Sequence, residues 1–317
     1  MAIDRRIDPA MNLTLRGSMV AIVTPFREDE VDEPAFRRLI DMHVEAGTSA
    51  IVPCGTTGES ATLSFDEHDR VIELAVEAAA GRIPVIAGTG SNNTREAIRL
   101  TRHAKEVGVD AALLISPYYN KPTQRGLYLH FKAIAEAVDL PLIVYNIASR
   151  TAVNIEPETF AQLAGIPTIV GVKESSGNLE QMSRIMQATG GRLTLLSGDD
   201  ALTLPALAIG GSGVISVTAN LVPRDVAAMV RAFQEGHNEE ARRWHERLLP
   251  LTRALFLETN PIPVKTAMGL LGMIRPELRL PLCEMSDANR ERLARALQDY
   301  GLLKDAPSLN PMPKVRR

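Results

Sequence analysis

The chain has 317 residues, a length that suits one large domain or two small ones. Hydrophobic residues make up 45% of it and the formal net charge is −3, so the composition supports a sizeable core and gives no basic footprint for nucleic acid. Two cysteines, Cys54 and Cys283, are too few for a disulfide framework and are typical of a reducing compartment. Residues 1–16 hold no apolar segment of signal-peptide type, and no run of 18 apolar residues occurs. We therefore expect a cytoplasmic protein that does not span a membrane.

Short apolar runs recur along the first two-thirds of the chain, with amphipathic segments between them. The runs lie at residues 19–24, 50–53, 85–87, 111–116, 142–146, 169–173, 193–197 and 214–217. Helical spacing of apolar residues marks residues 33–46, 66–80, 94–107 and 124–138. Eight such alternations predict an α/β fold, the (β/α)8 TIM barrel. A doubly wound open sheet is the weaker interpretation, because no glycine-rich dinucleotide fingerprint follows the first strand.

Beyond about residue 224 the pattern is helical only. The predicted helices lie at residues 224–235, 239–258, 263–271 and 286–300. We divide the chain into an N-terminal extension (1–16), the barrel (17–236), an appended C-terminal helical region (237–302) and a flexible tail (303–317).

Lys173 ends an apolar run that is typical of a strand buried on both faces. A lysine in such surroundings loses hydration, so its pKa falls and its free amine can attack a carbonyl to form a Schiff base. The alternative is a lysine at the rim of the barrel, either extended to water or paired with Glu174.

In a TIM barrel the active site lies at the carboxyl ends of the strands. Hydroxyl-bearing and small residues gather there in this sequence, at residues 24–25, 55–59, 88–90, 117–120, 145–146, 173–174, 198–199 and 216. A rim lysine would not explain this convergence on Lys173, which favours the Schiff-base interpretation.

Three further features could bind or activate a keto acid. The turn containing Thr56 and Thr57 offers hydroxyls and backbone N–H groups to a carboxylate, unless it is an ordinary βα turn. Tyr145 lies in the strand before the lysine strand and could shuttle protons if hydrogen bonds lower its pKa; the alternative is a core tyrosine. Arg150 could bind a carboxylate bidentately, or be merely solvated.

Other groups are weaker candidates. Histidines at positions 43, 68, 103, 130, 237 and 245 share no metal-ligand spacing, so we expect no metal. Cys54 has no histidine at its strand end and is expected to be a buried structural thiol. The glycine turn at residues 210–213 could hold a phosphate, but a glycine turn alone is weak support.

Several motifs in matching order resemble those of the class I pyruvate-dependent aldolases and lyases, which include N-acetylneuraminate lyase. These motifs are Gly-Thr-Thr-Gly-Glu-Ser at 55–60, Pro-Tyr-Tyr-Asn-Lys-Pro at 117–122, Tyr-Asn at 145–146 with Arg150, and Gly-Val-Lys-Glu at 171–174. Within this group the chain is most similar to the dihydrodipicolinate synthases, from about residue 17 to 303. Residues 196–200, 213–220 and 260–265 also resemble that family.

The resemblance implies a Schiff base between Lys173 and pyruvate, without cofactor or metal. It implies that Thr56 and Thr57 hold the pyruvate carboxylate, and that Tyr145, Thr56 and Tyr119 form a proton relay. Tyr119 would come from the neighbouring subunit of a tight dimer, within a homotetramer that is a dimer of dimers.

The resemblance also implies the second substrate, aspartate semialdehyde, whose carboxylate Arg150 would bind. Gly198 and Ile215 would line the pyruvate pocket through their backbone. The chain departs from the family at Ala148, where a proline is frequent, and we expect a freer Arg150 loop. A candidate lysine-feedback site comprises Ser60, Ala61, His68, Asn92, Glu96 and Tyr118, although Phe65 stands where a histidine is common.

Two other functions remain open at this point. One is a different pyruvate-dependent lyase, such as N-acetylneuraminate lyase or a 2-keto-3-deoxy sugar acid aldolase; Arg150 favours an acceptor that carries a carboxylate. The other is a non-catalytic barrel that binds a keto acid, for which a Schiff-base lysine would be unnecessary.

Overall fold

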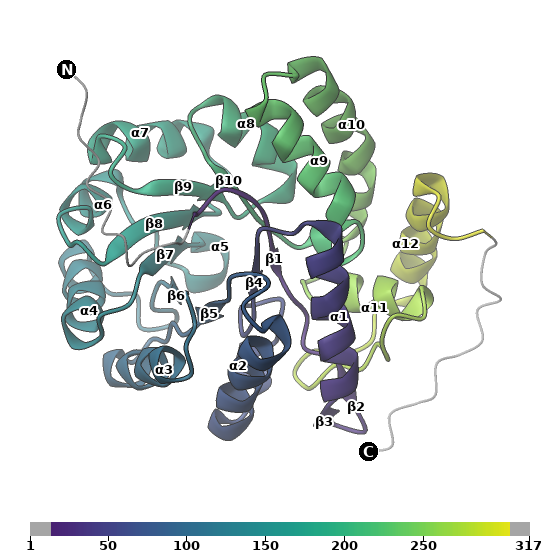
Figure 1. Ribbon diagram of the computed structural model, residues 1–317, viewed down its shortest axis with the longest axis horizontal. Helices are drawn as coiled ribbons and strands as arrows, with labels where there is room; N and C mark the ends of the chain where they lie inside the picture. The colour runs from purple at the N-terminus through teal and green to yellow at the C-terminus, as the bar shows by residue number, and fades with distance from the viewer. Residues whose placement is uncertain (1–13, 305–317) are drawn as a thin grey trace.

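Eight parallel strands form the wall of a barrel in the computed structural model, which describes residues 14–304 (Figure 1). The strands are β1 (Gly17–Ala21), β4 (Ala50–Val52), β5 (Ile86–Gly88), β6 (Ala111–Ile115), β7 (Leu142–Asn146), β8 (Ile169–Glu174), β9 (Thr194–Ser197) and β10 (Gly213–Ser216). They are ordered β4-β1-β10-β9-β8-β7-β6-β5, and a parallel bridge between Ile51 and Val85 joins the two ends. The predicted TIM barrel is confirmed. Residues 1–13 and 305–317, which hold most of the predicted extension and tail, lie outside the described residues.

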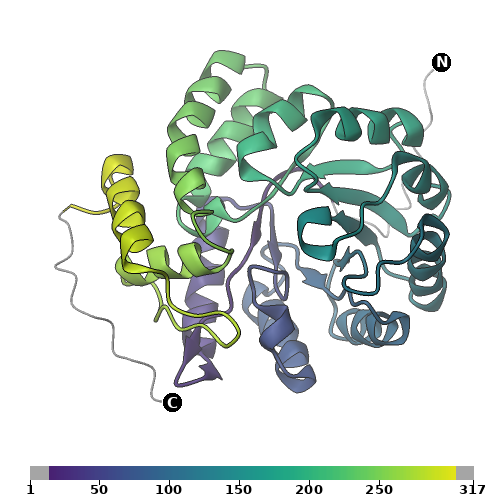
Figure 2. The same ribbon diagram turned by 180° about the vertical axis from the view of Figure 1, so that it is seen from behind.

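Helices surround this wall on its outer side, apart from the one-turn helix α5 (Ala148–Thr151), which lies over the barrel opening, as Figures 1 and 2 show from opposite directions. The helices before β10 are α1 (Glu33–Ala46), α2 (Phe65–Ala79), α3 (Thr94–Glu106), α4 (Gln124–Ala137), α5 (Ala148–Thr151), α6 (Pro157–Leu163), α7 (Leu179–Thr189) and α8 (Thr203–Ala208). Short 3-10 turns are η1 (Ser60–Thr62), η2 (Asp200–Leu202) and η3 (Thr218–Asn220). Helix α2 begins at a capping box in which Ser64 and Glu67 satisfy each other's backbone N–H groups.

The buried side chains form two layers, because neighbouring residues on a strand point to opposite faces. The larger layer lies between strands and helices. A smaller cluster fills the barrel interior and includes Met19, Ile143, Tyr145, Leu196 and Ile215. Both faces of the strands are therefore packed against other side chains, which is why the strands appear as continuous apolar runs in the sequence.

The last part of the described chain is helical, as predicted. It comprises α9 (Pro223–Gln234), α10 (Asn238–Ala254), α11 (Ile262–Leu270) and α12 (Asp287–Tyr300). Helices α11 and α12 lie together beside α1 in both views (Figures 1 and 2). The same side of the molecule carries a two-stranded hairpin, β2 (Phe26–Arg27) and β3 (Glu30–Val31), which the sequence did not predict. Within residues 14–304 no helix has the length and apolarity needed to cross a membrane.

Candidate active site

Lys173 lies inside the carboxyl end of β8 and is only 6% exposed. It is in register with Tyr145 of β7, and its Nζ lies 4.2 Å from the centre of the Tyr145 ring. Burial lowers the pKa of the Lys173 amine to about 7; the carboxylate of Asp200 opposes this shift and the guanidinium of Arg150 adds to it. The side chain is thus inside the barrel rather than at a solvated rim, and much of it is a free amine at neutral pH.

Tyr145 does not meet the condition set for it as a proton shuttle, a pKa lowered by hydrogen bonds. Burial raises the pKa of its phenol to about 12, and the side chains of Ser175, Arg150 and Thr56 lower it by less. The apolar barrel interior disfavours a phenolate more than those contacts favour it. The phenol therefore stays protonated at neutral pH. It can accept a proton while donating its own to a neighbouring hydroxyl, but it does not act as a phenolate base.

The turn at residues 55–59 follows β4 and carries both candidate threonines. Thr57 is buried, and its hydroxyl accepts a hydrogen bond from Nδ2 of Asn260 at 3.0 Å. The N–H of Gly58 closes the turn on the carbonyl of Gly55 at 3.1 Å. A side chain at Gly58 would be crowded, because an added Cβ would lie 3.1 Å from the Ile22 carbonyl oxygen. The turn is therefore tightly placed, and it brings Thr56 to the Tyr145 phenol.

Arg150 lies on α5, directly after β7. Its Nη2 donates a hydrogen bond to the carbonyl of Asn260 at 3.0 Å, while the residue as a whole is exposed at the mouth. The loop forms a helical turn in which the N–H of Arg150 bonds to the carbonyl of Ile147 at 3.1 Å and that of Ala152 bonds to the carbonyl of Ala148 at 2.9 Å. The freer loop expected from Ala148 stays a prediction.

Gly198 packs directly against the lysine side chain, and Ile215 lies in the barrel interior. Gly198 follows β9, and a Cβ added there would lie 1.9 Å from Ser175 Oγ and 2.8 Å from Lys173 Cε. Only a glycine allows this close packing without displacing the lysine chain. Ile215 of β10 is fully buried in the same interior cluster as Tyr145.

Asp200 is a buried acid that we did not predict as a site residue. Its carboxylate accepts hydrogen bonds from the Ser216 hydroxyl and from the N–H of Val217, the latter at 2.9 Å. These bonds fix the turn that follows Ile215. Burial raises the pKa of the Asp200 carboxyl, and its charge favours the protonated form of Lys173. The Asp-Asp pair at residues 199–200 was visible in the sequence, but nothing there indicated which acid turns inward.

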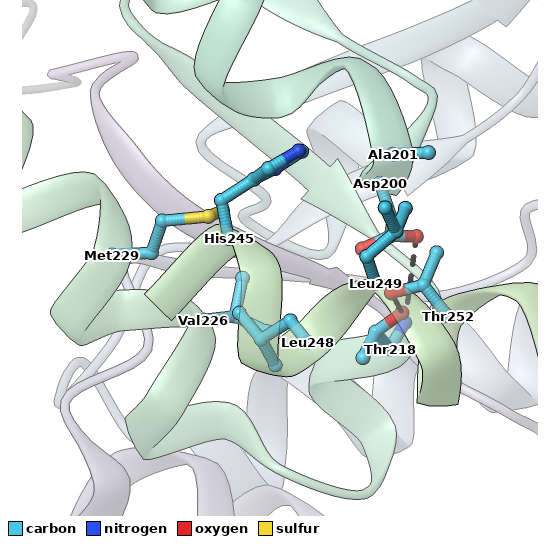
Figure 3. A pocket seen from close by; sticks show the side chains of 9 residues that line it. All are labelled: Asp200, Ala201, Thr218, Val226, Met229, His245, Leu248, Leu249 and Thr252. Atoms are coloured by element: carbon cyan, nitrogen blue, oxygen red, sulfur yellow. Dashed lines mark hydrogen bonds between the residues drawn. The ribbon is translucent and has the colours of Figure 1, made fainter. Parts of the chain in front are cut away.

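A cavity of about 10 Å³ lies behind Asp200, between η2, α9 and α10 (Figure 3). Asp200, Thr218 and Thr252 line one side, where Thr218 bonds to both of the others, and His245 lies across from them beside Met229. A single water needs roughly 10–15 Å³, so this cavity is too small for a substrate.

Tyr119 does not lie in the buried site of its own chain. It is 89% exposed, in the loop after β6, and has a φ of +71°, which is uncommon for a residue other than glycine.

The candidate lysine-feedback residues lie in the segments that follow β4, β5 and β6. The Nδ2 of Asn92 donates to the carbonyl of Tyr118 at 3.2 Å, and His68 is buried with its Nε2 3.0 Å from the carbonyl of Gly88. Ser60 and Ala61 form part of η1, and Glu96 lies in the first turn of α3. Phe65 is 52% exposed, with the guanidinium of Arg99 5.2 Å from its ring centre.

The weaker candidates have structural roles. Burial raises the pKa of the Cys54 thiol, whose Sγ lies 3.6 Å from the carbonyl of His68. The glycine turn at 210–213 precedes β10, so it lies at the amino ends of the strands, opposite the lysine. A Cβ at Gly213 would meet the carbonyl oxygen of Gly17 at 2.1 Å, which explains this glycine by packing. Among residues 14–304, no three His, Cys, Asp or Glu side chains gather as metal ligands.

Two residues of the appended helical region contact the threonine turn or Arg150, and the sequence did not predict them as site residues. Asn260 forms hydrogen bonds with both Thr57 and Arg150. The buried ammonium of Lys265 donates a hydrogen bond to the carboxylate of Glu59. The available signal was a lone lysine in the otherwise apolar segment of α11.

The comparisons with known proteins agree with this geometry. The profile of the Dihydrodipicolinate synthetase family matches residues 14–300. The chain belongs to this family. It is 57% identical, over 91% of its length and 99% of the relative, to 4-hydroxy-tetrahydrodipicolinate synthase of Syntrophus aciditrophicus.

Solved structures of dihydrodipicolinate synthases have the same fold. The enzyme of Aquifex aeolicus superposes with a TM-score of 0.90 at 55% identity, covering 92% of this chain and 100% of that one. The chloride-inhibited enzyme of Acinetobacter baumannii, solved in complex with pyruvate, has a TM-score of 0.90 at 46% identity, with coverage of 92% and 100%. Membership of the dihydrodipicolinate synthetase family makes this chain a class I aldolase-type lyase with a TIM-barrel fold.

Proposed function

We propose that this protein condenses pyruvate with L-aspartate 4-semialdehyde to give 4-hydroxy-tetrahydrodipicolinate, the first committed step of lysine synthesis through diaminopimelate. The observation that carries the proposal is the buried amine of Lys173, with its pKa lowered to about 7, directly against Tyr145. Curated relatives with this activity in their name match almost the whole chain. A non-catalytic keto-acid sensor would have no use for such an amine.

The reaction begins with attack of the Lys173 amine on the ketone carbon of pyruvate. Loss of water leaves an iminium, with the pyruvate carboxylate on the hydroxyls of Thr56 and Thr57. The iminium withdraws electrons from the methyl carbon, which loses a proton and becomes an enamine nucleophile. The enamine carbon then forms a bond to the aldehyde carbon of the second substrate, whose oxygen takes up a proton. The amino group of that substrate then attacks the iminium carbon and displaces the Lys173 nitrogen, which closes the ring and releases the free lysine amine. The covalent imine supplies the activation, so the proposal needs no cofactor or metal.

Proton transfers at these steps pass through hydroxyl groups. Tyr145 and Thr56 contact each other at the mouth, and positioned proton transfer contributes roughly 10²–10⁴ in rate. Tyr119 is the third member of the relay in this proposal, and it is exposed in the single chain. A neighbouring subunit would therefore supply it, in a homotetramer built as a dimer of dimers.

Arg150 favours aspartate semialdehyde over a sugar as the acceptor. Its guanidinium stands at the mouth and can hold a second carboxylate in a bidentate geometry, which a polyhydroxylated chain lacks. The backbone at Gly198 and Ile215 borders pyruvate. We place the enzyme in the cytoplasm, in keeping with two cysteines that are both unpaired.

We also propose feedback inhibition by lysine at the group formed by Ser60, Ala61, His68, Asn92, Glu96 and Tyr118. Phe65 departs from the family pattern there, but its ring still offers an apolar face. Rates measured across a lysine series test this directly, and a flat curve up to millimolar lysine removes the proposal.

Acceptor screening tests the proposed reaction. Purified protein with pyruvate should turn over aspartate semialdehyde, and Arg150→Met should raise the semialdehyde KM roughly tenfold to hundredfold, more than it raises the pyruvate KM. Turnover with a sugar aldehyde only would establish the alternative lyase. If borohydride traps no pyruvate adduct, the result would instead favour the non-catalytic barrel that binds a keto acid.

A further inference from the structure

A buried ion pair joins the appended helical region to the turn that carries Thr56 and Thr57. Lys265 of α11 places its Nζ 2.5 Å from Oε1 of Glu59, and both side chains are 0% exposed. The same Nζ donates to the backbone carbonyl of Thr24 at 2.9 Å and lies 4.2 Å from the centre of the Phe26 ring. Lys265 thus links α11 to two segments that are distant from it in sequence, residues 24–26 and Glu59.

Both hydrogen-bond acceptors of Lys265 hold the threonine turn. Glu59 ends it with a φ of +55°, and its N–H bonds to the carbonyl of Thr56 at 3.1 Å. Thr24 bonds through its hydroxyl to the carbonyl of Gly58 at 2.7 Å. A left-handed backbone at a residue other than glycine costs free energy and persists only where the surroundings fix it. The ammonium of Lys265 is the central contact of those surroundings.

A second residue of the same region, Arg279, contacts the other carboxylate oxygen of Glu59 through its backbone. The backbone N–H of Arg279 lies 3.3 Å from Oε2 of Glu59, and its guanidinium pairs with Glu67 at 2.5 Å. That guanidinium also lies 4.3 Å from the centre of the Phe26 ring. The C-terminal helical region therefore holds the chain at Glu59, where the turn ends, and at Glu67, where α2 begins.

Stabilisation of the fold does not by itself explain why the chain contains this buried ion pair. Desolvation of two charges offsets most of their attraction, and apolar replacements of buried ion pairs are frequently neutral or stabilising. Burial lowers the pKa of Lys265 to about 8, opposed by Glu59, so the amine remains charged at neutral pH. What the pair supplies is a bridge of fixed length between α11 and the turn.

We propose that Lys265 and Glu59 are positioning residues, which fix the turn at 55–59 and thereby set the hydroxyls of Thr56 and Thr57 on the substrate carboxylate. This inference rests on the proposed binding of pyruvate by that turn. It assigns the appended helical region a part in pyruvate affinity.

The test uses the full-length double variant Glu59→Gln with Lys265→Met, which removes both charges at similar side-chain size and leaves neither orphaned. The readout is the pyruvate concentration that gives half-maximal borohydride trapping. We expect this concentration to rise about tenfold or more, with a thermal midpoint within about 5 °C of the wild type. Loss of folded molecules would lower the amplitude of trapping but not change its half-saturation, so the two effects separate.

Tyr300→Phe is the matched control. It removes the 2.6 Å hydrogen bond from the Tyr300 hydroxyl to Asp225, another contact between α12 and the barrel, and should leave the half-saturation unchanged. If the double variant does not fold, Glu59→Gln alone carries the test, with an expected rise of about fivefold because one acceptor for Lys265 remains. A rise below twofold in the folded variant overturns the proposal. If the proposed function is wrong, the wild type will also fail to trap pyruvate, whereas failure of the positioning proposal alone leaves trapping by the wild type intact.

Discussion

Replacing Gly198 by alanine should impair the reaction of Lys173 while leaving the barrel folded. The added Cβ would lie 2.8 Å from Lys173 Cε and 3.0 Å from its Cγ, whereas ordinary contact begins at 3.4 Å. The lysine chain must therefore move by about 0.6 Å, and Ser175, whose Oγ would be 1.9 Å from the new atom, must change rotamer. Because a misplacement of about 1 Å can cost about 10²-fold in rate, we expect kcat/KM for pyruvate to fall tenfold to hundredfold.

Such a loss corresponds to about 1.4–2.7 kcal/mol in the barrier. The assay is steady-state turnover with aspartate semialdehyde, combined with the rate of borohydride trapping. Overpacking should reduce the free energy of unfolding by about 1–3 kcal/mol, which thermal unfolding measures. Gly165→Ala is the control, since its Cβ would meet the carbonyl oxygen of Gln162 at 3.2 Å, in the connection between α6 and β8 at the amino ends of the strands. A Gly198→Ala enzyme with kcat/KM within threefold of the wild type would refute the packing argument.

Two further substitutions test the chemistry. Tyr145→Phe keeps the ring against the lysine but removes the hydroxyl, and should lower kcat by about 10²–10⁴; a kcat within tenfold of the wild type would exclude Tyr145 from the relay. Lys173→Met should abolish trapping and make the protein more stable below pH 7. The folded pKa of Lys173, about 7, lies below the usual lysine value of 10.5, so wild-type stability rises with pH between these values. The stabilisation by Lys173→Met, followed by denaturant unfolding, should therefore shrink from pH 7 to pH 10, and a gain independent of pH would contradict this.

The barrel could be predicted from the sequence because its strands are buried on both faces. Such strands are continuous apolar runs, and β7 has the predicted bounds, residues 142–146. The helical spacing of apolar residues predicted a helix at residues 66–80, and α2 spans residues 65–79. The β2–β3 hairpin was missed because strands of two residues are too short to show a periodic pattern.

The prediction of the site was less complete where it depended on tertiary surroundings. Lys173 was predicted from its apolar neighbours, since burial along the strand is local information. The raised pKa of Tyr145 depends on what packs against it across the barrel, which no local pattern contains. The pairing of Lys265 with Glu59 spans 206 positions, so the unusual lysine in α11 could be noticed but its partner could not.

The pH dependence of borohydride trapping with pyruvate tests the central claim most directly. If the buried amine of Lys173 is the nucleophile, mass spectrometry should locate the reduced adduct on Lys173. The trapping rate should rise about tenfold per pH unit below 7 and level off above it, because the free amine fraction follows a pKa of about 7. An adduct on another residue, or a rate that continues to rise towards pH 10, would contradict the account.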